Sequence, residues 1–194
     1  NLMAVRVDNA QQPNYRWYSG SGIYRNVRLV ITQPVYVEQW GTYVTTPVVT
    51  SDSAKVVIQT TIKNEKNIQR AVKVEQSLFD VAGSLVTKTD ANLILPSGAS
   101  NQLLQDMVVP KPVLWSIENP YLYKIITKIY VQGILNDEYQ TNVGIRTFKF
   151  DVEKGFFLNG KSVKINGVCN HHDLGALGAA VNVRAIERQL EIMK

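Results

Sequence analysis

The stretch YLYKIITKIYVQ, residues 121–132, shows most clearly what kind of fold this chain forms. Apolar residues recur at every second position along most of it, which puts Tyr123, Ile125 and Ile129 on one side. Successive side chains of a β-strand point to opposite sides, so this spacing predicts a strand with one buried face and one solvated face.

Similar patterns recur on both sides of this stretch, each bounded by turn residues, over residues 35–43, 54–63, 70–80, 84–89, 101–109 and 137–150. About seven short strands, with turn signals every ~8–12 residues, predict an all-β fold: an immunoglobulin-like β-sandwich over residues 34–150. The chain lacks the Cys…Trp…Cys spacing of antibody domains. We expect Trp115 and Tyr121 in the core or at a corner; exposed platforms that stack on sugars are the alternative.

The N-terminal segment, residues 1–33, contains two more strand patterns on either side of the loop RWYSGSGIYRN at residues 16–26. In the first pattern Met3, Val5 and Val7 share one face, and the second covers residues 24–31. Two strands alone bury too little apolar surface to be stable. This segment is therefore expected to need further strands or the neighbouring domain.

The C-terminal segment, residues 151–194, has a different character. Strand patterns at residues 156–160 and 162–169 flank Asn159-Gly160, a dipeptide that strongly favours a β-hairpin. After the loop NHHDLGALGAA, Asn182 can cap a helix on which Val183, Ile186, Leu190 and Met193 recur at helical spacing. Both chain ends fall within such element patterns, which predicts an interior piece of a longer protein.

Composition excludes several classes of function. The chain has 194 residues and a net charge of +5, but its basic residues are scattered along strands rather than gathered in a block with aromatic residues. This pattern is typical of solvated strand faces, so no nucleic-acid partner is expected. No apolar run approaches the ~18 residues of a membrane span, so no membrane partner is expected either.

The single cysteine, Cys169, lies close to His171, His172 and Asp173. Zinc sites need three or four ligands at suitable spacing, and this group matches none of the usual patterns. We therefore predict no metal site, and we expect Cys169 to be a buried, inert thiol.

Three stretches in the same order resemble glycoside hydrolase family 2, which includes β-galactosidases, β-glucuronidases and β-mannosidases. LMAVRVDN with RWYSGSGIYRN resembles the end of the family's sugar-binding jelly roll. LWSIENPYLY, residues 114–123, resembles the end of its immunoglobulin-like domain. Residues 144–178, GIRTFKFD…GFFLNGKSVKINGVCNHHDLGALG, resemble the start of its catalytic (β/α)₈ barrel. The resemblance implies a jelly-roll tail at 1–33, the sandwich at 34–150 and the first β/α piece of the barrel at 151–194.

The resemblance also implies a substrate site without a catalytic pair. Retaining glycosidases use two carboxyl groups, and in this family both are glutamates on later barrel strands. Asn64-Glu65 has the family's Asn-Glu form but lies in a turn of the sandwich, and Glu187 and Glu191 are read as solvated helix charges. No catalytic residue is therefore assigned. By resemblance His171 would bond a sugar hydroxyl, and the weaker candidates for substrate binding are Asn170, His172, Asp173, Arg16 and Trp17.

These expectations describe a fragment of a retaining β-glycosidase, most similar to a bacterial β-galactosidase, that lacks the catalytic glutamates. The expected partners are a carbohydrate substrate and the remaining domains of the same chain. No cofactor is expected, although the complete enzyme could use metal ions or form a homo-oligomer. A periplasmic or secreted location is favoured over a cytoplasmic one. The alternative is a non-catalytic carbohydrate-binding or structural sandwich module.

Overall fold

In a computed structural model of this protein, the chain divides into two compact units. The structure describes residues 2–8, 10, 22–171, 174–178, 180 and 182–194. One unit is Ile31–Ile165, and the other joins Asn1–Val30 with Asn166–Lys194.

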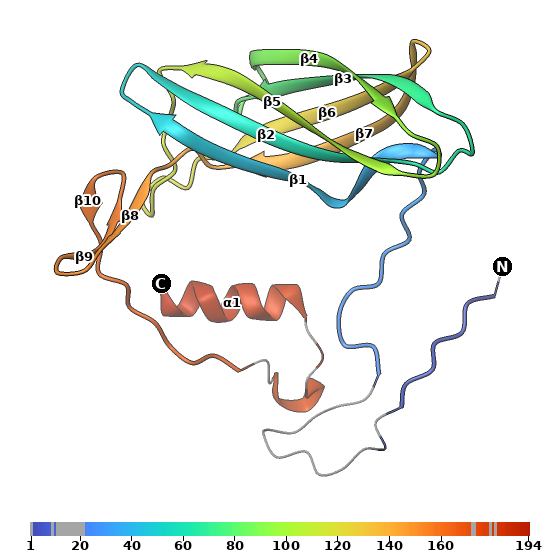
Figure 1. The fold of residues 1–194 in the computed structure, drawn as a ribbon. Coiled ribbons are helices and arrows are strands. Elements are labelled where there is room, and N and C mark those ends of the chain that lie inside the picture. The colour runs from blue at the N-terminus through green and yellow to red at the C-terminus, as the bar shows by residue number, and fades with distance from the viewer. Residues whose placement is uncertain (1, 9, 11–21, 172–173, 179, 181) are drawn as a thin grey trace. The chain divides into compact units, whose positions relative to one another are not determined.

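The larger unit is a sandwich of two antiparallel sheets (Figure 1). A three-stranded sheet has the order β1-β2-β5, and a four-stranded sheet has the order β4-β3-β6-β7. The strands are β1 Val35–Val49, β2 Ser53–Asn64, β3 Arg70–Phe79, β4 Leu85–Leu95, β5 Ser100–Pro110, β6 Tyr123–Val131 and β7 Ile134–Val143. This arrangement confirms the expected immunoglobulin-like sandwich, whose strands run from Val35 to Val143.

The inward-facing residues of the two sheets form two apolar clusters. One centres on residues such as Ile58, Leu78 and Ile125, and the other on residues such as Ile62, Val74 and Ile129. In both clusters the buried residues alternate with outward-facing ones along each strand, as the period of two requires. Burial of these side chains, at roughly 25 cal/mol per Å² of apolar surface, holds the sheets together.

Several strand boundaries differ from the sequence prediction. The strand expected at residues 35–43 continues to Val49. The strand expected at residues 84–89 continues to Leu95, because all of β4 pairs with β3. The strand expected over 137–150 begins at Ile134, directly after a tight turn in which Gln132 and Gly133 both have positive φ. It ends at Val143 and resumes as β8, Phe148–Asp151, because the chain leaves the sheet at Gly144.

The strands expected in the N-terminal segment do not form among the described residues 2–8, 10 and 22–33. Met3 and Val5 are exposed, as are Val27 and Leu29. A strand is stable only when a neighbour pairs with its backbone and a second layer covers its apolar face, and nothing described here supplies either for these segments. The strand patterns therefore do not form strands within the described part of this chain, and the expected need for further strands or the neighbouring domain stays a prediction.

A small three-stranded sheet follows the sandwich, with the order β10-β9-β8. Its other members are β9, Gly155–Leu158, and β10, Lys161–Ser162. In the second unit, η1 covers Gly175–Leu177 and helix α1 covers Val183–Met193. None of the helices formed by the described residues has the length and apolar character that a membrane span requires.

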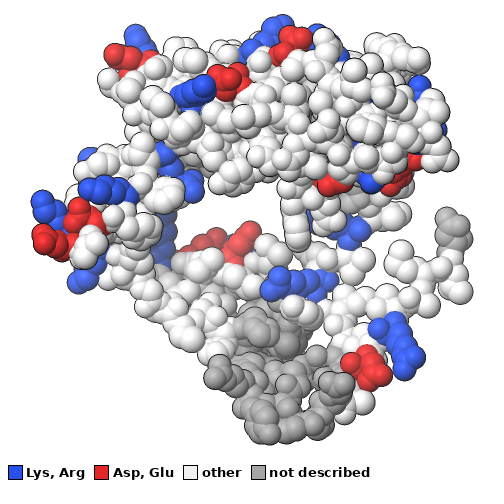
Figure 2. All heavy atoms as spheres, viewed as in Figure 1, with Lys and Arg blue, Asp and Glu red and all other residues white. Residues whose placement is uncertain are grey.

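Basic and acidic side chains are interspersed among uncharged ones on the face of the sandwich seen in Figure 2. On the outer faces of the sheets, basic and acidic residues pair across neighbouring strands, as in Lys55–Asp106, Lys73–Asp90 and Lys128–Glu138. These pairs fit the solvated strand faces that the sequence predicted.

Candidate functional site

The hairpin between β9 and β10 leads the chain from the sandwich toward the predicted site loop. Asn159 and Gly160 form its turn with φ values of 49° and 76°, and Leu158 pairs with Lys161. Positive φ at both central residues defines the tight turn that Asn-Gly favours. The hairpin expected at this dipeptide is therefore confirmed.

Asn159 also ties this hairpin to the end of the sandwich. Its side-chain Nδ2 donates to the carbonyl oxygen of Trp115 at 2.9 Å, and its Oδ1 accepts from the backbone N–H of Thr147 at 3.0 Å. Its own backbone N–H donates to the Thr147 carbonyl oxygen at 2.9 Å. These three bonds fix where the chain leaves the sandwich, and the Asn-Gly signal alone did not predict them.

Trp115 forms the other side of this junction. It is half-buried, its backbone N–H donates to the carbonyl oxygen of Ile145, and the guanidinium of Arg146 lies 5.4 Å from its ring centroid. Tyr121 packs against the apolar cluster and meets Tyr123 edge-on, with ring centroids 4.9 Å apart. Both residues are half-buried rather than exposed, in line with the core or corner positions that the sequence predicted.

The strand expected at residues 162–169 is formed only at Ser162. Val163 still donates its backbone N–H to Phe156, but the described residues provide no ladder for residues 164–169, and Ile165 and Val168 are exposed. Cys169 is exposed as well, so the expected buried thiol is wrong. Because the described part of the chain places no sheet beside this segment, its apolar side chains stay exposed.

Two of the predicted substrate-binding residues can be placed within the second unit. Asn170 Nδ2 donates to Gln189 Oε1 of α1 at 3.4 Å, and His171 Nε2 lies 3.5 Å from Cys169 Sγ. This end of the site loop is therefore in contact with helix α1. His172, Asp173, Arg16 and Trp17 lie outside the described residues.

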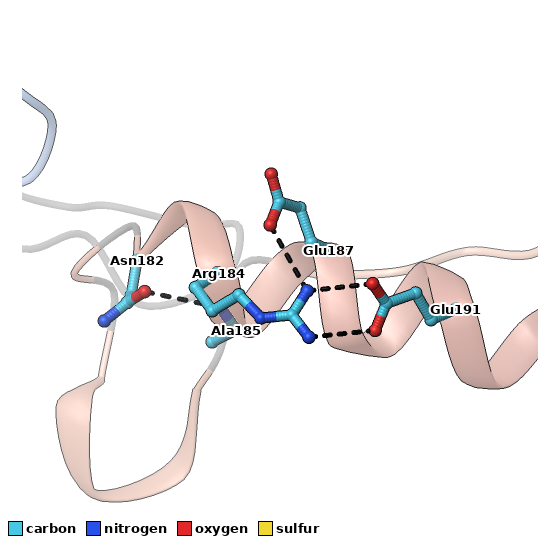
Figure 3. Close-up of polar contacts among 5 residues, drawn as sticks. All are labelled: Asn182, Arg184, Ala185, Glu187 and Glu191. Atoms are coloured by element: carbon cyan, nitrogen blue, oxygen red, sulfur yellow. Dashed lines mark hydrogen bonds and ion pairs between the residues drawn. The ribbon is translucent and has the colours of Figure 1, made fainter.

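Helix α1 begins at the predicted cap, where Asn182 Oδ1 accepts the backbone N–H of Ala185 at 3.3 Å (Figure 3). Arg184 forms a bidentate pair with Glu191, at 2.8 and 3.1 Å, and also reaches Glu187 at 3.3 Å. The hydrogen bonds to Glu191 and then to Glu187 raise the pKa of Arg184. Both glutamates are thus exposed partners of one arginine, as expected for solvated helix charges.

Asn64 and Glu65 serve the sandwich turn. The Asn64 side chain is fully buried, and its Nδ2 donates to the carbonyl oxygens of Ile68 and Pro96, each at 2.9 Å. Glu65 Oε1 accepts from the hydroxyl of Tyr36 at 3.0 Å, and this bond raises the pKa of Tyr36. The dipeptide therefore closes a turn between strands, in line with its sequence context.

Among the described residues, no group of three or more His, Cys, Asp or Glu side chains could hold a metal ion. Asn170 and His171 instead bring hydrogen-bond donors and acceptors, which suit hydroxyl groups.

Comparison with known proteins relates the whole chain to enzymes that act on glycosides. The chain is 52% identical over 194 residues to beta-galactosidase BoGH2A of Bacteroides ovatus, covering 100% of this chain and 23% of that protein. A beta-glucuronidase of Bacteroides fragilis is 29% identical over 207 residues, with 100% of this chain and 29% of that protein covered. The chain therefore spans about a quarter of the length of these relatives.

Solved structures show the same relationship. The crystal structure of a glycosyl hydrolase family 2 member from Bacteroides cellulosilyticus superposes with a TM-score of 0.89 at 41% identity, over 96% of this chain and 26% of that one. The beta-glucuronidase of Bacteroides uniformis gives a TM-score of 0.85 at 29% identity, over 96% and 24% of the two chains. The sequence model of Glycosyl hydrolases family 2 matches residues 35–146, which are the sandwich itself. This chain belongs to family 2 of the glycosyl hydrolases.

Proposed function

We propose that this chain is the central part of a retaining β-glycosidase whose substrate is a terminal β-galactoside. The observation that carries the proposal is the 52% identity, over the full chain, to a protein named as a beta-galactosidase. The proteins named as beta-glucuronidases are less similar, at 29% identity for the one from Bacteroides fragilis. A galactoside is therefore the first substrate to test and a glucuronide the second.

The catalytic carboxyl groups lie outside residues 1–194 in this proposal. Retention requires two carboxyl groups ~5–5.5 Å apart, one as nucleophile and one as acid/base. Glu65 accepts a bond from Tyr36, and Glu187 and Glu191 share Arg184, so each is committed to a neighbouring side chain. Neither Glu65 with Tyr36 nor the two glutamates on Arg184 form the arrangement that retention needs, in which two carboxyl groups converge on a cleft.

The three-part division proposed from the sequence gives each segment a role. Residues 34–150 are a rigid spacer, and residues 151–194 start the catalytic barrel. In the complete enzyme, neighbouring barrel strands pair with residues 162–169 and complete the strand that is absent here. Residues 1–33 are the last strands of the jelly roll, with Arg16 and Trp17 on the rim of the substrate site.

The site loop contributes substrate contacts in the complete enzyme. Active sites of such barrels lie on the loops that follow the strands, and residues 170–173 follow the first one. His171 bonds a sugar hydroxyl, with Asn170, His172 and Asp173 beside it. The contact between Asn170 and Gln189 supports this placement, because it links the loop to the helix that comes next in the chain.

The test uses the complete protein encoded by the same gene, assayed with aryl β-galactoside and aryl β-glucuronide. We expect turnover of the galactoside, and we expect His171→Ala to lower kcat/KM by roughly tenfold or more, the value of one hydrogen bond. The control is Lys124→Ala, which changes an exposed residue on the outer face of β6 in the sandwich, away from the loop. If kcat/KM were unchanged in His171→Ala, the proposed hydrogen bond between His171 and a sugar hydroxyl would be wrong. Glycan binding without turnover would favour the non-catalytic module.

A further inference from the structure

A layer of polar side chains crosses the interior of the sandwich between its two apolar clusters. On β2, Thr60 stands between Ile58 of one cluster and Ile62 of the other. Gln76 has the same position on β3, between Val74 and Leu78. The polar layer contains one inward-facing residue from each of six strands: Thr42, Thr60, Gln76, Gln105, Thr127 and Thr141.

Part of this polar layer is paired within the protein. Gln76 Nε2 donates to Thr60 Oγ1 at 2.8 Å and reaches Thr127 Oγ1 at 3.4 Å. These three residues are fully buried, and they connect the two sheets at the centre of the sandwich. A hydrogen bond in such a low-dielectric interior is strong, and for the same reason an unpaired polar group there is costly.

The rest of the layer has no partner in the protein. Across the described residues, the buried side-chain atoms without a hydrogen bond are Thr42 Oγ1, Gln76 Oε1, Gln105 Nε2, Gln105 Oε1 and Thr141 Oγ1. Each of these atoms belongs to the polar layer. Gln105 is only 5% exposed, yet neither end of its amide is bonded. The large majority of buried side-chain polar atoms in folded proteins do have a partner, so such a concentration needs a specific cause.

A surface groove reaches the edge of this layer. It runs between β1 and β7, has a volume of about 700 Å³, and is lined by Thr42 and Thr141 among others. Thr42 is the cross-strand neighbour of Thr60, which accepts from Gln76. The layer therefore extends from the groove wall to the centre of the core.

We propose that the polar layer is a binding site for internal water, which enters from the groove between β1 and β7. A buried water needs two to four polar partners. Thr42 and Thr141 offer hydroxyls at the groove end of the layer, and the Gln76 carbonyl oxygen and both amide ends of Gln105 offer partners deeper in it. Because Thr42 and Gln105 lie on opposite edge strands of the sheet β1-β2-β5, the layer requires more than one water. Water is the ligand that suits this set, because it can both donate and accept, and no charged group belongs to the layer.

A crystal structure at about 1.5 Å resolution or better tests the proposal, since ordered water is then visible. We expect density for water hydrogen-bonded to Gln105 and to at least one other member of the layer. Gln105 rotated so that both amide ends bond protein atoms, with no water between them, would overturn the proposal.

A solution measurement gives an independent answer. Gln105 side-chain amide protons should give cross-peaks to water of opposite sign in NOESY and ROESY spectra, as slowly exchanging water does. The exposed Gln102 on the same strand should give only the weak, same-sign peaks of surface water. In Gln105→Met the crystal should lose the water at this position, whereas Gln102→Met should keep it. The proposal would be contradicted if the Gln105 amide protons gave only the weak, same-sign peaks of surface water. It would also be contradicted if the crystal of Gln105→Met kept the water at this position.

Discussion

The side-chain amide of Asn159 donates a 2.9 Å hydrogen bond to the backbone carbonyl of Trp115, 44 residues earlier in the chain. With the bonds to Thr147, this contact attaches the small sheet β8–β10 to the end of the sandwich. The junction therefore depends on one residue that is both a turn former and a bonding partner.

Replacing Asn159 separates these two roles. Asn159→Ala removes both side-chain bonds and places a residue that disfavours positive φ in the turn, so we expect the free energy of unfolding to fall by about 2–3 kcal/mol. Asn159→Gly also removes the bonds but accepts the turn geometry, so its loss should be about 1–2 kcal/mol. Urea denaturation measures both values. Equal losses in the two variants would show that backbone geometry is unimportant here.

Gly144 is needed because Trp115 lies against it. A Cβ at this position would lie 3.0 Å from the Cβ, Cγ and Cδ1 atoms of Trp115. We expect Gly144→Ala to destabilise the sandwich by about 1–3 kcal/mol through overpacking and to lower Tm by several degrees. The matched control is Gly167→Ala, where the added Cβ meets nothing within 4 Å. Calorimetry that found equal Tm values for the two variants would contradict this packing argument.

Trp40 adopts a backbone conformation that bulky residues avoid. Its φ is 57° and its side chain is 86% exposed, at an irregularity in β1 beside Gly41. Left-handed backbone costs an ordinary residue roughly 1–2 kcal/mol, whereas Asn tolerates it. We therefore expect Trp40→Asn to raise the free energy of unfolding of this chain by about 0.5–1 kcal/mol. A lower stability, measured in urea, would show that the indole makes contacts that its exposure does not reveal.

Asp151 gives the small sheet a dependence on pH. The ion pair with Lys149, followed by backbone N–H bonds from Lys154 and Glu153, lowers the pKa of Asp151. Because the folded-state pKa is the lower one, its stabilising effect is present above the unfolded-state pKa of ~3.9 and is lost as pH falls through the folded-state value. The difference between wild type and Asp151→Asn should therefore shrink below about pH 4. Carboxyl chemical shifts titrated by NMR check the direction, and a midpoint at or above the usual Asp value would contradict it.

The sandwich could be predicted because its strands carry their own signal. Val56, Ile58 and Ile62 face the core at every second position, and the structure buries all three. Local sequence patterns did not predict two strand boundaries, one of which depends on a distant contact and the other on the backbone geometry of an unexpected residue. The break between β7 and β8 depends on Trp115 lying against Gly144, and the start of β7 depends on positive φ at Gln132, which is not a residue that signals a tight turn.

The candidate site was less predictable for a related reason. Residues 24–31 and 164–169 have strand-like sequences, but a strand needs a partner, and the described residues provide none. The exposure of Cys169 follows from the same missing sheet. The polar layer was also missed, because Thr60 alternates in step with Ile58 and Ile62 and so reads as one more core position.

Covalent labelling of the complete protein tests the central claim most directly, namely that this chain is the non-catalytic middle of a retaining β-glycosidase. A retaining enzyme forms a glycosyl-enzyme ester, which an activated 2-deoxy-2-fluoro glycoside of its preferred sugar would trap for peptide mass spectrometry. We predict one labelled glutamate, located outside residues 1–194, and no hydrolysis of aryl β-glycosides by the chain alone. A label on any residue from 1 to 194, or no label on an enzyme that turns over the substrate, would contradict the account.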